Sequence, residues 1–470
     1  MKKSLLWIVV LLLSIAMVAV FSLAGCKAKA ATEETIATEE AAEEEVAKEV
    51  VEEEEPLEPV TITMWYWGEQ EGPGLEGWVK ESAEMFQAEN PNITVEPVLQ
   101  TTEGLYAAFR TAAEAKDIPD IQYLWPDLWT FEDVWMGNVM DITEYWTEED
   151  LQYITHKNGG IFEGKRYSIP QYFMPMIMVY NKTVLEDNGI ESPPETWDEF
   201  IEDCITLEEN GYVPFTAGLK DERWPVYAFD LIIVDYINNI SDIVAPTIGK
   251  AKWTDYTYAD WWKKLDMLLP YLNEDAASID FYQGADAFGL GDAGFSFFAY
   301  GGIGPLYEVL GDDLVEMPFP KMGEVSDLSG AIIGSAQNLV VTAYCKHPKE
   351  ANDFLKFITS PERANAMYVA SGLFPTNSEF DVSLLRNNFE KSVFKRVQER
   401  SLETEPVNFI PNEIIMGPMC TSLLPMYNGE ITPEEAAQKV ENEAVRWRES
   451  NPEILENFIR WYDSMVEMGR

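Results

Sequence analysis

Short strand-like and helix-like segments alternate from residue 60 onward, and this order limits the folds that the chain can adopt. The strand-like segments are β-branched and aromatic, whereas the segments between them place apolar side chains at helical spacing. Successive β-α-β units predict a mainly parallel sheet with helices on both faces. Such sheets bind ligands beyond the carboxyl ends of their strands, so the loops after the first and third strands are candidate site loops. In chain order, strands are expected at 60–67, 93–98 and 120–124, and helices at 77–89 and 105–115.

Length and charge bound the class of protein. The chain has 470 residues, and the part from about residue 59 is long enough for two domains with a sizeable core. The formal net charge is −49, from 82 acidic and 33 basic residues. Binding to nucleic acid requires a basic stripe, which the sequence lacks, so nucleic acid is not an expected partner. The acidic balance favours solubility and the attraction of cations.

The first 25 residues have the three parts of a secretory signal. Two lysines precede an apolar run at residues 5–20, and small residues then lead to Cys26. A membrane-spanning helix is the competing interpretation, because the run is about long enough to cross a bilayer. The sequence Leu-Ala-Gly-Cys at 23–26 resembles the bacterial lipobox, in which the peptide is cut before the cysteine and the thiol carries diacylglycerol. The resemblance implies export and a lipid anchor on Cys26.

Residues 26–58 form an expected acidic tether. After Cys26 they contain 13 Glu, three Lys and no aromatic residue. Repulsion between like charges and the lack of large apolar groups argue against a packed element. A solvated helix is the alternative, since Glu and Ala favour helix. Either state would hold the following domain away from the lipid surface.

The middle of the chain carries a more specific resemblance. Gly-Lys-Arg-Tyr-Ser-Ile-Pro at 164–170 is followed by Val-Tyr-Asn-Lys at 179–182 and by Pro-Pro-Glu-Thr-Trp-Asp-Glu-Phe at 193–200. In this order the segments resemble the extracellular solute-binding proteins of carbohydrate ABC transporters, the maltose-binding-protein class. Each segment is weak evidence alone, and the order is the strong part. Further matches in the same order lie at 86–93, 347–357, 360–362, 371–375 and 431–436.

The resemblance implies an α/β, two-lobed periplasmic-binding-protein-like fold of type II. Each lobe would hold a mainly parallel sheet flanked by helices, and a hinge would let the lobes close on a ligand. The first lobe is expected at 59–170 plus 335–375, and the second at 171–334 plus 376–470. The chain would cross between the lobes near 170–173, 334–338 and 375–377.

Two loops of the first lobe have the composition of a sugar site. Sugar rings present apolar CH faces and hydroxyl edges, so they are bound by aromatic plates with carboxyl or amide groups beside them. One loop offers Trp67, Glu69 and Gln70, and the other offers Trp125 and Asp127. Any single tryptophan is more often a core residue, but the loop positions favour a ligand contact.

Further candidates follow from the resemblance in the hinge and the second lobe. Tyr172 lies at the expected hinge, and Arg223 and Trp224 would offer a guanidinium and an aromatic plate after a turn. Gly294–Phe298 departs from the family pattern, so roles in this region do not transfer residue by residue. A glycine pair at 301–302 is equally compatible with a simple helix-start turn. The remaining cleft candidates are Tyr300, Gly301 and Ser335.

Catalytic and metal-binding interpretations find little support. The two histidines, His156 and His347, show no metal-ligand spacing and no neighbouring nucleophile. Cys204, Cys345 and Cys420 have no metal pattern either; they allow one disulfide or three buried thiols. No phosphate loop or dinucleotide fingerprint follows the first strand. With 82 acidic residues, chance pairs of carboxylates carry no information about glycoside cleavage.

The expected function is therefore that of a lipid-anchored binding protein, not an enzyme. It would capture a sugar, most simply an oligosaccharide, and deliver it to ABC permease subunits. It would act as a monomer without cofactor or metal, at the outer face of the cytoplasmic membrane or in the periplasm. Two alternatives stay open: a binding protein for a cationic solute such as a polyamine or basic peptide, and an exported glycoside hydrolase.

Overall fold

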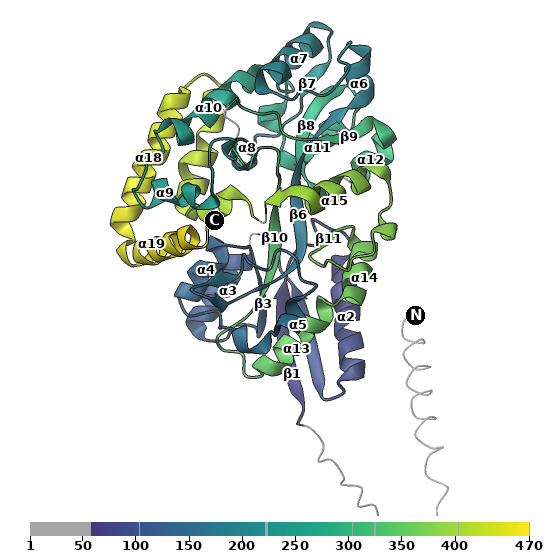
Figure 1. Cartoon of the computed structure of the whole chain (residues 1–470), viewed down its shortest axis with the longest axis vertical. Helices are drawn as coiled ribbons and strands as arrows, with labels where there is room; N and C mark the ends of the chain where they lie inside the picture. Colours follow the sequence, from purple (N-terminus) through teal and green to yellow (C-terminus); the bar gives the residue numbers. More distant parts are fainter. Residues whose placement is uncertain are drawn as a thin grey trace, which may run out of the picture. The chain divides into compact units, whose positions relative to one another are not determined.

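The computed structural model describes residues 58–102, 104–220, 224–302, 304–323, 326–402 and 404–469 (Figure 1). The expected signal peptide, the lipidation site at Cys26 and nearly all of the tether lie outside these residues. In the part of the chain that the structure describes, no helix is long and apolar enough to cross a membrane. Cys204 is buried and Cys345 half-buried, and both are free thiols.

A single sheet runs through the folded part in the strand order β2-β1-β3-β10-β6-β8-β7. β9 and β11 also pair with β6, β12 pairs with β10, and β4 and β5 form a separate hairpin. The strands are β1 (Val60–Tyr66), β2 (Ile93–Leu99), β3 (Ile121–Leu124), β4 (Ile161–Phe162), β5 (Lys165–Arg166), β6 (Ile169–Asn181), β7 (Val213–Phe215), β8 (Ala293–Ala299), β9 (Leu314–Met317), β10 (Ile332–Val341), β11 (Phe374–Pro375) and β12 (Ser401–Leu402).

The outer strands have the parallel pairing expected from β-α-β units, whereas the centre is antiparallel. β1 is parallel to both β2 and β3, and β7 is parallel to β8. β10 is antiparallel to β3 and β6, and β6 is antiparallel to β8. The sheet is therefore mixed, because its two long central strands run in opposite directions and join the two parallel parts.

The helices agree with the sequence pattern where it was clear. The helix expected at 105–115 has these limits, and the one expected at 77–89 begins two residues earlier. Thr196 and Thr432 each form a capping box that satisfies the first turn of a helix. The longer helices are α2 (Leu75–Glu89), α3 (Leu105–Ala115), α4 (Leu128–Trp135), α7 (Trp197–Glu209), α8 (Trp224–Ile233), α10 (Tyr256–Leu268), α11 (Phe281–Phe288), α13 (Pro348–Ile358), α14 (Pro361–Ser371), α15 (Asn388–Arg400), α18 (Pro433–Ser450) and α19 (Pro452–Glu467). The shorter ones are α5 (Glu148–Leu151), α6 (Lys182–Asp187), α9 (Val244–Thr247), α12 (Gly304–Leu310), α16 (Asn412–Ile414) and α17 (Leu423–Tyr427).

Buried apolar side chains form two large cores, one on each side of the central strands. One core joins β1, α2 and β2 to α13, α14 and α15. The other joins α7, α8 and α10 to α18 and α19. Figure 1 shows β1, α2 and α13 below β6 and β10, α7 above them, and α18 and α19 to their left. Two lobes built from discontinuous segments fit this arrangement. The limits of the lobes stay a prediction. In the last part of the chain, Val397 belongs to the first core and Val407 to the second.

The three segments expected to cross between the lobes lie side by side. Tyr172 of β6 is paired with Gln337 of β10 and with Pro375 of β11. All ten residues of β10 are buried, as are all but one of the 13 residues of β6. The inner edge of any cleft between the lobes is therefore formed by these strands.

Candidate functional site

The loop after β1 places Trp67 against the loop after β3. The Trp67 ring lies 5.5 Å from the Tyr123 ring and 5.7 Å from the Trp125 ring, between centroids. Its indole N–H donates to the hydroxyl of Thr102 at 2.9 Å. Only 7% of Trp67 is exposed, so it is a fixed part of this wall.

Trp125 is the more accessible of the two tryptophans. It is half-buried and stacks on Tyr106, with 5.0 Å between ring centroids and 26° between planes. Its backbone N–H donates to the Tyr106 hydroxyl at 2.7 Å, and the Trp129 ring contacts both rings. Trp67, Tyr106, Trp125 and Trp129 form one group, which we name the aromatic platform.

Polar side chains meet the platform from the central strands. The Tyr172 hydroxyl donates to Glu71 Oε2 at 3.0 Å, and the Tyr123 hydroxyl donates to Gln337 Oε1. Tyr123, Tyr172 and Gln337 are almost completely buried. The first bond joins the loop after β1 to β6, and the second joins β3 to β10.

A second polar group lies where residues 404–408 pass between the lobes. The Thr404 hydroxyl donates to Asp127 Oδ2. The Asn408 amide donates to Ser335 Oγ at 3.3 Å and to Glu405 Oε2 at 3.4 Å. Asp127 adopts φ 55°, a left-handed backbone that is costly for a residue other than glycine. Such local strain is concentrated at functional sites, which supports a role for Asp127.

Asp230 of α8 reaches the same segment from the second lobe. Its Oδ1 accepts from the backbone N–H of Val407 at 2.7 Å. Its carboxyl is close enough to Glu405 for the charge of Glu405 to raise the pKa of Asp230. Glu71, Asp127, Asp230 and Glu405 therefore belong together, and we name them the interlobe acid group.

Burial dominates the electrostatics of the acid group. It raises the pKa of Glu71 to about 8, against which the hydrogen bond from Tyr172 acts. It also raises the pKa of Glu405 to about 8, with further increases from the charges of Glu71 and Asp127. For Asp230 burial is again the first cause, and the charge of Glu405 the second. These carboxyls resist ionisation because the surrounding protein reduces their hydration, and because Glu405 and Asp230 also have acidic neighbours.

The residues proposed from sequence fall into two sets. Trp67, Gln70, Trp125, Asp127, Tyr172 and Ser335 lie in or beside the platform and the acid group, with Gln70 accepting from Thr102 at 3.2 Å. Glu69 instead accepts from the backbone N–H groups of Gly74 and Glu76, so it orders the start of α2. Trp224 is 1% exposed and stacks on Phe297, so it is a residue of the second core. Arg223 lies outside the described residues.

Tyr300 and Gly301 approach the acid group from the second lobe. Tyr300 is 6% exposed and stacks on Phe374 at 4.1 Å between centroids. A Cβ on Gly301 would lie 2.3 Å from the backbone oxygen of Glu71. The two lobes therefore touch backbone to backbone at this point, and only glycine fits. This result favours a packing role over a mere helix-start turn.

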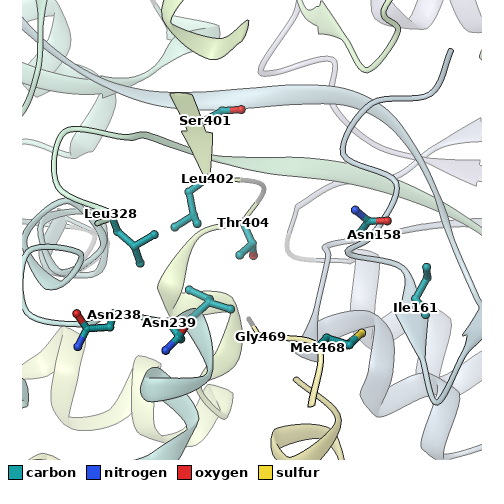
Figure 2. Close-up of a pocket in the computed structure, with 11 residues that line it drawn as sticks. Asn158, Ile161, Asn238, Asn239, Leu328, Ser401, Leu402, Thr404, Met468 and Gly469 are labelled. Carbon is teal, nitrogen blue, oxygen red and sulfur yellow. The ribbon is translucent and has the colours of Figure 1, made fainter. Parts of the chain in front are cut away.

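Two cavities lie beside the acid group. One of about 480 Å³ includes Thr404, the partner of Asp127, in its wall. Figure 2 shows side chains of Asn158, Asn238, Asn239, Leu402 and Met468 around it. The other, of about 390 Å³, is lined by Gln70, Glu71, Tyr300 and Gly301, among others. Polar groups at both cavities can bind hydroxyls, while the apolar walls cover carbon.

The family follows from a match to the bacterial extracellular solute-binding proteins over residues 66–364, more than half of the chain. The chain belongs to this family. A relative is the diacetylchitobiose binding protein DasA of Streptomyces coelicolor, which is 24% identical over 399 residues covering 82% of this chain and 88% of DasA. The melibiose/raffinose/stachyose-binding protein MelE of Bacillus subtilis is 26% identical over 311 residues, covering 61% of this chain and 68% of MelE.

Solved structures of solute-binding proteins share the fold. A chitin oligosaccharide binding protein superposes with a TM-score of 0.72 at 17% identity, covering 83% of this chain and 98% of that one. RafE in complex with raffinose gives a TM-score of 0.64 at 19% identity, covering 82% and 98%. The two-lobed type II architecture expected from the sequence is thereby confirmed.

The contact at Gly301 yields a first prediction for this solute-binding protein. Gly301→Ala should hold the lobes apart, because the new methyl group would overlap the Glu71 backbone. Small-angle scattering should show a larger radius of gyration, and any cleft ligand should bind about tenfold more weakly. Gly77→Ala is the matched control, since a Cβ there meets nothing within 4 Å. Unchanged dimensions and affinity for Gly301→Ala would contradict the contact.

The raised pKa values predict a pH dependence of stability. A carboxyl with a folded pKa of about 8 and an ordinary value of 4.5 binds more protons in the folded state between these pH values. Stability is therefore full below about pH 4.5 and is lost as pH rises towards 8. Glu71→Gln and Glu405→Gln remove that loss.

Thermal unfolding from pH 5 to 8 measures the effect. Relative to the unsubstituted protein, each variant should gain about 1 °C in Tm at pH 8 over its difference at pH 5, as expected for ~1 kcal/mol in a fold of this size. Glu89→Gln, a change at an exposed carboxylate of α2, controls for net charge. A gain at pH 5 with none at pH 8 would reverse the predicted sign.

Proposed function

We propose that this protein captures a sugar, most simply an oligosaccharide, between its two lobes and delivers it to an ABC permease. The observation that carries the proposal is the aromatic platform beside carboxyl, amide and hydroxyl groups where the lobes meet. A half-buried Trp125 can cover the CH face of a sugar ring, and Gln70, Asp127 and Ser335 are near enough to bind hydroxyls.

The names of the relatives support a saccharide. DasA is named for diacetylchitobiose and MelE for melibiose, raffinose and stachyose, all of them short saccharides. The cavities beside the acid group, of about 480 and 390 Å³, fall in the size range of small-molecule sites. Binding without turnover is the proposed activity.

Closure of the lobes would commit the bound sugar to transport. A ligand that contacts both lobes binds the closed form better than the open one, so it shifts the population towards closure. The meeting of Gly301 and Glu71 is a contact that an open form would lack. The permease would then dock on the closed form.

The location is proposed from the amino-terminal sequence. A lipid on Cys26 would hold the protein at the outer face of the cytoplasmic membrane or in the periplasm, and residues 26–58 would give it reach. The folded part would work as a monomer.

Removal of the Trp125 ring tests the proposed sugar site. Trp125→Ala should weaken saccharide binding about tenfold, equivalent to ~1.4 kcal/mol, because the ring face is removed. A thermal-shift screen over mono- and oligosaccharides first identifies a ligand, since binding to the folded state raises Tm. Calorimetry with that ligand then compares the variants.

A second tryptophan of the same lobe provides the control. Trp65 of β1 is half-buried and lies outside the aromatic platform, so Trp65→Ala should leave affinity unchanged. Equal affinity of Trp125→Ala and the unsubstituted protein would reject this site. A screen without any saccharide response would reject sugar capture, and release of shorter saccharides during incubation would indicate a hydrolase.

The anchor is tested by one substitution. Cys26→Ser removes the thiol that would carry the lipid, so the protein should shift from the membrane fraction to the soluble fraction after expression in a bacterial host. Its ligand affinity should not change, because Cys26 precedes the folded part. Retention in the membrane fraction would favour the spanning-helix interpretation.

A further inference from the structure

The interlobe acid group brings carboxyl groups from both lobes to one place. Glu71 and Asp127 follow strands of the first lobe, Asp230 lies on α8 of the second, and Glu405 lies on the segment between them. Neutral groups donate hydrogen bonds to these carboxyls, namely Tyr172, Thr404, Asn408 and the Val407 backbone. Among the described residues, no lysine or arginine acts on Glu71, Asp230 or Glu405.

Asp230 supplies an independent sign of a missing partner. Its side chain is completely buried, and its Oδ2 has no hydrogen-bond partner among the described residues. The other oxygen is fixed by Val407, and the charge of Glu405 acts on this carboxyl. A buried carboxyl oxygen that makes no bond is costly whether or not it carries the proton, so a place for a ligand group is left beside Glu405.

A protonated amine fits this acceptor group better than a metal ion. An ammonium group has three N–H donors and a positive charge, and it can satisfy oxygens from several carboxyls at once. In the described residues, no group of three or more His, Cys, Asp or Glu side chains could hold a metal ion. The electron-rich faces of the nearby aromatic platform also favour a cation over an anion.

We propose that the sugar captured in this cleft carries a protonated amine, bound by Glu405 and Asp230. This inference rests on the proposed function and narrows it to amino sugars with a free amine. The platform selects for a ring, and the acid group selects for charge. A linear polyamine satisfies only the second condition, so it should bind more weakly.

A matched pair of ligands tests the charge. Because Glu405 has a pKa of about 8, an amine binds to it as an ion pair by displacing the carboxyl proton. Calorimetry at about pH 7, where most of the amine is protonated, compares glucosamine oligomers with N-acetylglucosamine oligomers of equal length. The free-amine form should bind about tenfold or more tightly than the acetylated form. Its affinity should fall steeply with added salt, unlike that of a neutral sugar. Spermidine, which has amines and no ring, should bind about tenfold more weakly than the amine oligomer.

Three variants locate the effect. Glu405→Gln and Asp230→Asn should each reduce the preference for the amine to about threefold or less, with affinity for the acetylated oligomer nearly unchanged. Asp230→Asn keeps an oxygen for the Val407 N–H, and Glu405→Gln is the second variant in case the first does not fold. Glu413→Gln, an exposed carboxylate of α16, is the control and should keep the full preference.

The outcomes distinguish a failure of the amine inference from a failure of the proposed sugar capture. Binding of neutral saccharides with equal or higher affinity would overturn the amine inference and leave sugar capture standing. Spermidine binding as tight as that of the amine oligomer would overturn the ring requirement and indicate a polyamine protein. No response to any saccharide would overturn the proposed function itself.

Discussion

The antiparallel pairing of β6 with β10 is the constraint on which the rest of the structure depends. The register runs from Met176 opposite Ile333 to Ile169 opposite Leu339, and almost every residue of the two strands is buried. Because both lobes share these strands, each lobe's loops are brought to the same place. A register shift at Gln337 and Asn338 interrupts the ladder beside Tyr172. Irregularities of this kind re-aim side chains next to functional sites, here towards the meeting point of the lobes.

Where the lobes meet, close packing of the backbones brings carboxyl groups into surroundings that disfavour their charges. At Gly301 the backbones of the two lobes approach as closely as glycine allows, and the Tyr300 ring stacks on Phe374 nearby. The same approach half-buries Glu71 and Glu405, and the surroundings raise the pKa of each carboxyl. A positive charge beside these carboxyls, either as protons or on a ligand, would relieve this electrostatic penalty. A ligand that supplies it would gain affinity.

The sequence predicted the parts of the fold that depend on local chemistry. The capping box of Thr196 and Glu199 and the limits of α3 follow from neighbouring residues, so they were readable. The antiparallel pairing of β10 with β3 and β6 could not be predicted from the sequence. The direction of β10 depends on the path of the chain between the lobes, which neighbouring residues do not determine. Trp224 follows a turn, as ligand contacts often do, yet it faces the second core.

The acid group was hidden for a different reason. Glu71, Asp230 and Glu405 come from distant parts of a chain with 82 acidic residues, so none of them stands out. What distinguishes them is their position where the two lobes meet, and that position is a property of the fold. Tyr106 was not predicted as a site residue. It lies in the first turn of α3, where an aromatic residue is expected to pack as part of an amphipathic helix.

The geometry of the platform limits how a ring can be bound. One face of Trp125 is covered by Tyr106, and Trp129 and Trp67 meet it at 73° and 78°. At most one face of Trp125 is therefore open to a ligand. The indole of Trp67 is held by Thr102, which in turn bonds to Gln70, so the supporting rings cannot rotate away freely. A rigid plate with a single open face binds a sugar ring in a defined plane at little entropic cost. The plane of the ring then decides which of its substituents points to Glu405 and Asp230.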